Sequence, residues 1–111
     1  MEPGRLFVYG TLRRGSPNKF AQLLEANARF MGIGRIQARI YRFPNYSGAV
    51  ASDDLADSVS GELFELTDPS ILAVLDAYEG AEFERATVSV RLDTGDPLQA
   101  WVYFLKAPPG E

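Results

Sequence analysis

The sequence predicts an α+β domain built on a small, mixed, mostly antiparallel β-barrel flanked by two helices. Several segments alternate between apolar and polar residues with a period of two, as strands do. Two short segments, 18–26 and 69–78, place their apolar residues at helical spacing instead. Clusters of turn-forming residues at 44–48 and 93–97 mark chain reversals between strands. The 111 residues suit one domain, residues 1–111.

The first predicted strand is Leu6–Tyr9, which carries no charge and suits burial on both faces. Gly10 follows it, and we expect this glycine to take backbone angles that other residues avoid and so to turn the chain sharply. Gly15–Asn18 closes the loop, and a helix capped by Asn18 runs to Ala26. Backbone N–H groups at such a strand–turn–helix junction can converge on an anion. The alternative is a tight turn with no role beyond chain reversal.

The second predicted helix has Asp68 as its cap and Pro69 as its first residue, and it runs to Tyr78. Gly80 then ends it in a left-handed conformation. The remaining strands are expected at 28–43 (one long strand, or two joined at its glycines), 49–51, 59–66, 83–92 and 98–105.

Residue usage excludes several classes of chemistry. The chain has no His and no Cys, which removes Ser–His and Cys–His nucleophile pairs and most zinc sites. The net charge of −4 argues against a nucleic-acid partner, because such partners need a basic face. No apolar run approaches membrane-spanning length and no leader pattern precedes the first strand, so we expect a cytoplasmic protein without a membrane partner. An enzyme of this composition depends on carboxylates, Tyr, Lys or the backbone.

Among the acidic residues, Glu79 has an unusual position. It lies in the last turn of the second predicted helix, between Tyr78 and Gly80. A negative side chain there faces the negative end of the helix dipole, which raises the free energy of its ionised form. Partial burial would raise it further, and a carboxylate with a raised pKa exchanges protons near neutral pH. The alternative is an exposed glutamate in a fraying last turn.

Two motifs carry a family resemblance. Residues 7–15 read Phe-Val-Tyr-Gly-Thr-Leu-Arg-Arg-Gly, and residues 75–80 read Leu-Asp-Ala-Tyr-Glu-Gly, with an aromatic-x-Arg at 83–85. Together with the strands at 61–66 and 100–104, these segments resemble the gamma-glutamylcyclotransferase-like family, and within it the gamma-glutamylamine cyclotransferase-like subgroup. The resemblance covers nearly the whole chain, with the motifs in the family's order.

The resemblance implies a fold, a reaction and a set of roles. It implies the family's barrel and the conversion of a gamma-glutamyl amine or gamma-glutamyl peptide to 5-oxoproline and a free amine, an acyltransferase or lyase reaction. Such a reaction requires no metal and no cofactor, and its partner is a small molecule with a gamma-glutamyl group. Glu79 is the implied catalytic acid–base. The substrate-binding residues that we expect are Tyr9, Gly10, Thr11, Leu12, Arg85 and Tyr103. The alternative for Arg85 is an ion pair with a nearby acid. The alternative for Tyr103 is a place in the core.

A second class of function stays open, a non-catalytic protein of the same fold that binds a small anionic metabolite or a protein partner. Such a binder has no need for an acid at position 79. A third class, a small RNA-binding barrel, needs basic and aromatic residues on one sheet face, and the acidic balance disfavours it. The catalytic hypothesis makes a spatial prediction: Glu79 and the Tyr9–Leu12 segment lie across one cavity.

Overall fold

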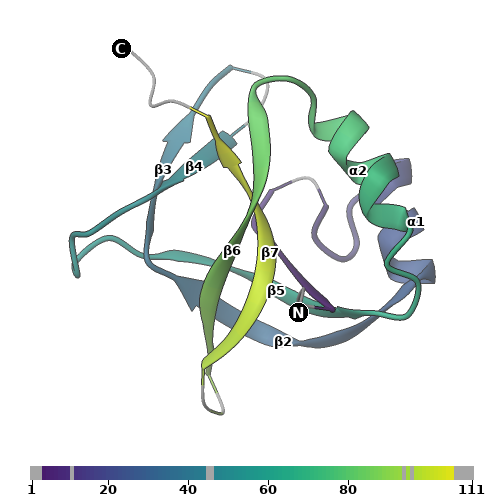
Figure 1. Ribbon diagram of the computed structural model, residues 1–111, viewed down its shortest axis with the longest axis horizontal. Coiled ribbons are helices and arrows are strands. Elements are labelled where there is room, and N and C mark those ends of the chain that lie inside the picture. Colours follow the sequence, from purple (N-terminus) through teal and green to yellow (C-terminus); the bar gives the residue numbers. More distant parts are fainter. Residues whose placement is uncertain (1–3, 11, 45–46, 94, 96, 107–111) are drawn as a thin grey trace.

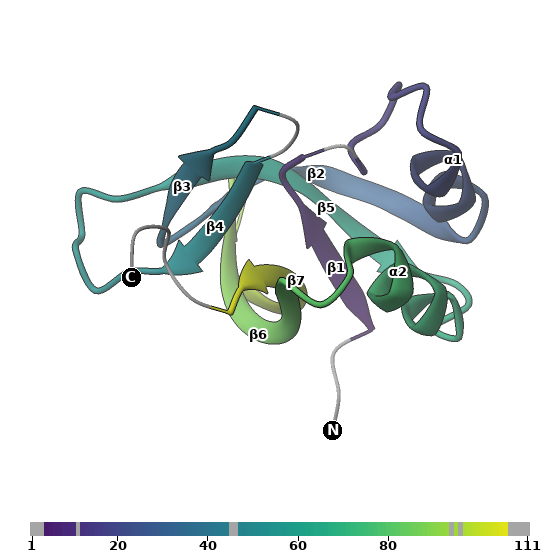
Figure 2. The ribbon, with the colours of Figure 1, turned by 90° about the horizontal axis from the view of Figure 1, so that it is seen from above.

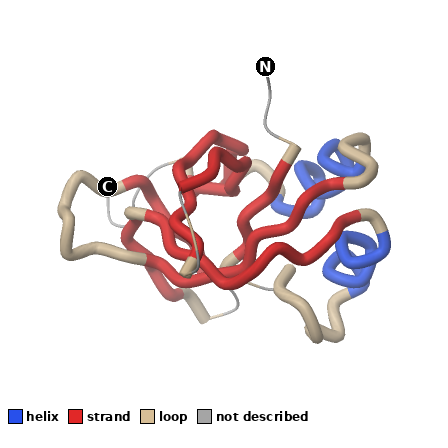
Figure 3. The backbone as a smooth tube through the Cα atoms, turned by 90° about the horizontal axis from the view of Figure 1, so that it is seen from below, coloured by secondary structure: helices blue, strands red, loops and turns tan. Residues whose placement is uncertain are grey.

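The computed structural model of the protein describes residues 4–10, 12–44, 47–93, 95 and 97–106 (Figure 1). Over these residues the chain forms seven strands and two helices, and Figure 3 shows both helices on one side of the strands. In chain order they are β1 (Arg5–Val8), α1 (Lys19–Ala26), β2 (Ala28–Ile36), β3 (Ala38–Arg42), β4 (Ser47–Ala51), β5 (Val59–Leu66), α2 (Ile71–Glu79), β6 (Phe83–Leu92) and β7 (Pro97–Leu105).

The barrel closes through strands from the two ends of the described chain. Strands β1, β5, β2, β6 and β7 pair in that order, and β1 also pairs with β7, so these strands form a closed ring. The pairs are antiparallel except β1–β7, in which Leu6 and Trp101 are parallel partners. A hairpin of β3 and β4 extends the sheet through a parallel pairing of Ala49 with Phe104. The predicted fold class, a mixed and mostly antiparallel barrel with two helices, is confirmed.

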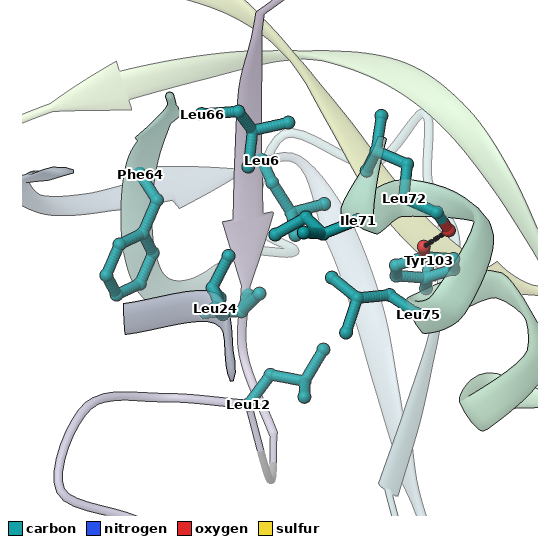
Figure 4. Close-up of a cluster of buried hydrophobic side chains, with 10 residues drawn as sticks. Leu6, Leu12, Leu24, Phe64, Leu66, Ile71, Leu72, Leu75 and Tyr103 are labelled. Atoms are coloured by element: carbon teal, nitrogen blue, oxygen red, sulfur yellow. Dashed lines mark hydrogen bonds between the residues drawn. The ribbon is translucent and has the colours of Figure 1, made fainter. Parts of the chain in front are cut away.

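Alternation along β1 decides what lies on each side of the barrel wall. Leu6 and Val8 belong to a cluster with the apolar faces of both helices, whereas Phe7 belongs to the cluster that fills the barrel. Figures 1 and 2 show the helices together on one side of the barrel and the β3–β4 hairpin on the other. Figure 4 shows the helix-side cluster, which comprises Leu6, Val8, Leu12, Leu24, Phe64, Leu66, Ile71, Leu72, Leu75 and Tyr103.

The region of alternation at 28–43 is two strands, and they divide at Gln37 and not at a glycine. Gly32 instead marks a β-bulge, because the β2–β5 register shifts between Phe30 and Gly32 and the φ of Gly32 is 148°. The strand β4 begins at Ser47, ahead of the short strand predicted at 49–51.

The observed start of α1 agrees with the start predicted from the sequence, and the observed start of α2 differs from the predicted one. Asn18 caps α1 as predicted, and its side-chain oxygen accepts two backbone N–H bonds from the first turn. The helix α2 begins at Ile71, later than the predicted Pro69. The Asp68 carboxylate accepts bonds from the backbone N–H (3.1 Å) and the hydroxyl (2.6 Å) of Ser70, so it stabilises a separate turn before the helix. Neither helix in the described part of the chain is long and apolar enough to cross a membrane.

Candidate active site

A cavity of about 1070 Å³ lies where the loop after β1 meets the end of α2. Both motifs contribute to its wall, the first through Tyr9, Gly10 and Leu12 and the second through Tyr78 and Glu79. The wall is completed by Phe7, Val8, Arg13, Arg14, Gly15, Ser16, Ile40, Arg42, Ser47, Ser58, Val59, Ser60, Glu62, Glu82, Phe83 and Tyr103. The fold therefore brings two segments that are distant in sequence to one concave site, as binding sites require.

Glu79 is the last residue of α2 and is partly buried. Gly80 follows with φ 85° and ψ −172°, a conformation that is essentially restricted to glycine, so the helix ends sharply at this carboxylate. The positive φ was predicted, although the ψ lies outside the left-handed helical region. Burial raises the pKa of the Glu79 carboxyl from 4.5 to about 7. The side chain can therefore hold or release a proton at neutral pH.

Tyr9 anchors the start of the loop to the barrel. Its hydroxyl donates to the carbonyl of Tyr103 (2.6 Å) and accepts from the backbone N–H of Ala49 (3.0 Å), so it links β1 to β7 and β4. Burial raises the pKa of the Tyr9 hydroxyl to about 12, and the nearby charge of Glu79 contributes to the rise. Tyr9 is therefore a neutral anchor at neutral pH, and it lies within electrostatic reach of Glu79.

Gly10 has a different role from the one its position suggested. Positive φ angles among the described residues occur at Gly15 (77°), Gly32 (148°) and Gly80 (85°), so Gly10 does not use a conformation reserved for glycine. The prediction of its backbone angles was wrong. A Cβ built on Gly10 would meet no heavy atom within 4 Å, and the residue lines the cavity. A side chain at this position would therefore meet open space, and Gly10 and Glu79 line the same cavity.

The rest of the loop is fixed by the fold beneath it. Leu12 is 2% exposed and belongs to the helix-side core. The backbone N–H of Arg13 donates to the carbonyl of Gly10 (3.2 Å), and that of Arg14 donates to a carboxylate oxygen of Glu62 (2.6 Å). These two N–H groups are therefore engaged within the protein. Thr11, which was predicted to bind substrate, lies outside the described residues.

Arg85 and Tyr103 both contact Asp76, three residues before Glu79 on α2. The Arg85 guanidinium donates to Asp76 through Nε (2.9 Å) and Nη2 (3.2 Å), and it lies over the Trp101 ring. The Tyr103 hydroxyl donates to the same carboxylate (2.7 Å). Burial alone would raise the pKa of Asp76, but the bonds from Arg85 and Tyr103 lower it overall. Tyr103 lies in the core, 4% exposed, and also lines the cavity. Arg85 instead forms an ion pair with Asp76.

Sequence reasoning missed three carboxylates at or beside the site, Asp76, Glu62 and Glu82. A signal existed for Asp76, because it lies three residues before Glu79 and so on the same helical face. Glu62 looks like an ordinary acid on an alternating strand, and only the pairing of β5 with β1 places it beside the loop. Among the described residues, no three acidic, His or Cys side chains gather as a metal site.

The described residues thus combine a small barrel with one cavity, and a partly buried carboxylate with a raised pKa lines that cavity. The family model for gamma-glutamyl cyclotransferase, AIG2-like proteins matches residues 6–111. A protein of Methanocaldococcus jannaschii with a provisional gamma-glutamylcyclotransferase name is 33% identical, over 89% of this chain and 82% of that protein. The gamma-glutamylaminecyclotransferase of Rattus norvegicus is 31% identical, over 88% of this chain and 75% of that protein.

The solved structures agree with the sequence matches. The crystal structure of an AIG2-like protein from Mus musculus superposes with a TM-score of 0.75 at 28% identity, and the match covers 98% of this chain and 82% of that one. The chain belongs to the gamma-glutamyl cyclotransferase, AIG2-like family. The resemblance that the two motifs indicated is confirmed.

Proposed function

We propose that the protein converts a gamma-glutamyl amine or gamma-glutamyl peptide to 5-oxoproline and a free amine, with Glu79 as the general acid–base. The observation that carries the proposal is the position of Glu79, a partly buried carboxylate that shares one cavity with Tyr9, Gly10 and Leu12. Membership of the family supports cyclotransferase chemistry in general.

The proposed reaction needs one proton carrier. The α-ammonium group of the substrate gives a proton to the Glu79 carboxylate, and the freed α-amine attacks the γ-carbonyl carbon of the same molecule. The five-membered ring closes as the new C–N bond forms, and the old γ-amide C–N bond breaks. Glu79 returns its proton to the departing nitrogen and then takes the second proton of the attacking nitrogen, which becomes the lactam N–H. That proton passes to the released amine, which leaves as an ammonium ion, so the enzyme ends in its starting state. Because the attack is intramolecular, holding the substrate folded supplies much of the acceleration.

The raised pKa of Glu79 suits both transfers. The α-ammonium group of the substrate lies beside its own α-carboxylate and holds its proton more tightly than an ordinary carboxyl does. Raising the Glu79 pKa from 4.5 to about 7 narrows the gap between the two pKa values by about 2.5 units, which lowers the free-energy cost of the transfer by about 3 kcal/mol. The same acidity is sufficient to protonate the leaving amine as its C–N bond breaks.

The other site residues have proposed roles of two kinds. Tyr9, Gly10 and Leu12 are proposed to hold the gamma-glutamyl head at the cavity wall, with Gly10 leaving space for it, and Thr11 is proposed to bind the substrate with them. Tyr103 lines the cavity with its ring while its hydroxyl bonds to Asp76. For Arg85, the ion pair with Asp76 supports an indirect role, in which it orients Asp76 and Tyr103 behind the substrate.

The experiment is a product assay on matched variants. Purified protein is incubated with gamma-glutamyl dipeptides, gamma-glutamyl alkylamides and the gamma-glutamyl-lysine isopeptide, and 5-oxoproline is measured by mass spectrometry. We expect product from the wild type with at least one of them, and a kcat at least about 100-fold lower in Glu79→Gln. The exposed Glu84 on β6 does not line the cavity, so Glu84→Gln is the control and should match the wild type.

Two outcomes would reject the proposal. No 5-oxoproline from the wild type with any substrate rejects the activity, and equal product from Glu79→Gln rejects the role of the carboxylate. A protein that binds 5-oxoproline in titration calorimetry but forms none from any substrate would be the non-catalytic binder.

A further inference from the structure

Glu62 is the one charged side chain among the described residues that falls in the buried class, at 8% exposed. It lies on β5 directly opposite Val8, the last residue of β1. Its neighbours on the same face, Phe64 and Leu66, belong to the helix-side core. An apolar residue would continue this pattern, so the carboxylate at this position requires an explanation.

Within the described residues, the side-chain hydrogen bond and the ion pair of Glu62 both go to Arg14, near the end of the loop. One carboxylate oxygen accepts the backbone N–H of Arg14 at 2.6 Å, a short bond of the charge-assisted kind. The other oxygen lies 3.6 Å from Nε of the same residue. The Arg14 guanidinium in turn lies over the ring of Phe30, 3.5 Å from its centroid. A strand of the barrel thus holds a backbone atom of the loop, and not only a side chain.

Glu62 completes a set of anchors along the loop. Tyr9 is fixed through its hydroxyl, and Leu12 is fixed in the core. Both come before Arg14, and the exposed Arg13, Arg14 and Gly15 offer no apolar anchor of their own. The Glu62 bond therefore holds the chain after Leu12 against the barrel, next to the part of the cavity wall that Gly10 and Arg13 form.

A purely stabilising role does not account for a charge at this place. Burying a carboxylate costs free energy unless its hydrogen bonds return that energy, and an apolar residue at this position would avoid the cost. What an apolar residue does not supply is an acceptor for a loop N–H. We propose that Glu62 is a positioning residue for the cyclotransferase reaction, fixing the backbone of the 10–14 loop in the shape that binds the gamma-glutamyl group. This inference rests on the proposed function.

The test distinguishes the loss of the hydrogen-bond acceptor of Glu62 from the loss of its negative charge. Glu62→Gln keeps a carbonyl oxygen for the Arg14 N–H, Glu62→Ala removes it, and Arg14→Met removes the ion pair but keeps the N–H. The control is Glu65→Ala on the same strand, because Glu65 pairs with Arg29 at the surface. We expect kcat/KM to fall at least about tenfold in Glu62→Ala, mainly through a higher KM, because the variant loses a charge-assisted hydrogen bond to the loop backbone. Glu65→Ala should stay within about threefold of the wild type, Glu62→Gln should lose less than Glu62→Ala, and Arg14→Met should keep the protection of its own amide from exchange.

Amide exchange measures the loop directly, whatever the activity. Hydrogen–deuterium exchange at the Arg14 amide should accelerate in Glu62→Ala and not in Glu62→Gln, and the dissociation constant of 5-oxoproline should rise in parallel with KM. Unchanged KM and unchanged 5-oxoproline binding in a folded Glu62→Ala would overturn the inference, as would an equal loss in Glu62→Gln. If the wild type makes no 5-oxoproline, the proposed function fails, and exchange together with 5-oxoproline binding still decides whether Glu62 positions the loop.

Discussion

The partly buried carboxylate of Glu79 makes the free energy of unfolding depend on pH, and the substitution Glu79→Gln removes that dependence. The folded pKa is about 7 and the ordinary value is 4.5. Between these two pH values the folded state binds more protons at this site than the unfolded state does. The free energy of unfolding therefore falls as the pH rises from 4.5 to about 7, and this contribution is absent above about 7. Glu79→Gln removes the titration.

The magnitude follows from the two pKa values. The difference of about 2.5 pH units corresponds to about 3.4 kcal/mol at 1.36 kcal/mol per unit. Because Glu79 is only partly buried, we expect about 2–3 kcal/mol. Relative to the wild type, Glu79→Gln should therefore gain that much free energy of unfolding between pH 5 and pH 8. Glu84→Gln, at an exposed position of β6, should show no such trend.

The assay is urea unfolding followed by circular dichroism at pH 5, 6, 7 and 8. The quantity of interest is the difference in free energy of unfolding between the Glu79→Gln variant and the wild type at each pH. A difference that rises across this range and then levels off supports a raised Glu79 pKa. A difference that stays constant with pH would refute the reasoning, because it would mean that Glu79 titrates alike in both states.

Three further substitutions test the anchors and the open space of the site. Tyr9→Phe leaves the Tyr103 carbonyl and the Ala49 N–H without their partner, so urea unfolding should show a loss of about 1–3 kcal/mol; no loss would mean that water replaces the hydroxyl. Gly10→Val should fold with an unchanged melting temperature yet lower kcat/KM at least about tenfold, and full activity would show that substrate does not use this space. Gly80→Ala should lose about 1–3 kcal/mol in the same unfolding assay, because φ is 85°, and a smaller loss would indicate that the helix end relaxes.

Local sequence patterns predicted the elements of the barrel but not its closure. The alternation at 59–66 and 83–92 identified β5 and β6 with the observed bounds, because half-buried strands impose a period of two. The closure depends on a parallel contact between Leu6 and Trp101, and no local pattern encodes so distant a pairing. The start of α2 was misplaced because Asp68 caps a preceding turn with the same chemistry that caps a helix.

In the site, too, residues whose role follows from local sequence were predicted, and residues whose role depends on distant partners were not. Glu79 stood out because its position at a helix end is electrostatically unfavourable, and that property is local. Glu62 and Asp76 were missed because their roles depend on partners from other parts of the chain, Arg14 in the loop after β1 and Arg85 on β6. The interpretation of Gly10 failed for a related reason: its backbone angles depend on how the folded chain leaves β1, which no local pattern defines.

The central claim is that Glu79 carries the proton during ring closure, and the pH dependence of kcat/KM for 5-oxoproline formation tests it most directly. The account predicts an acidic limb with an apparent pKa of about 7, since the reaction needs the ionised carboxylate to accept the proton of the α-ammonium group. A rate that stays level down to pH 5 would contradict it, because an ordinary carboxylate, or none, would then be sufficient.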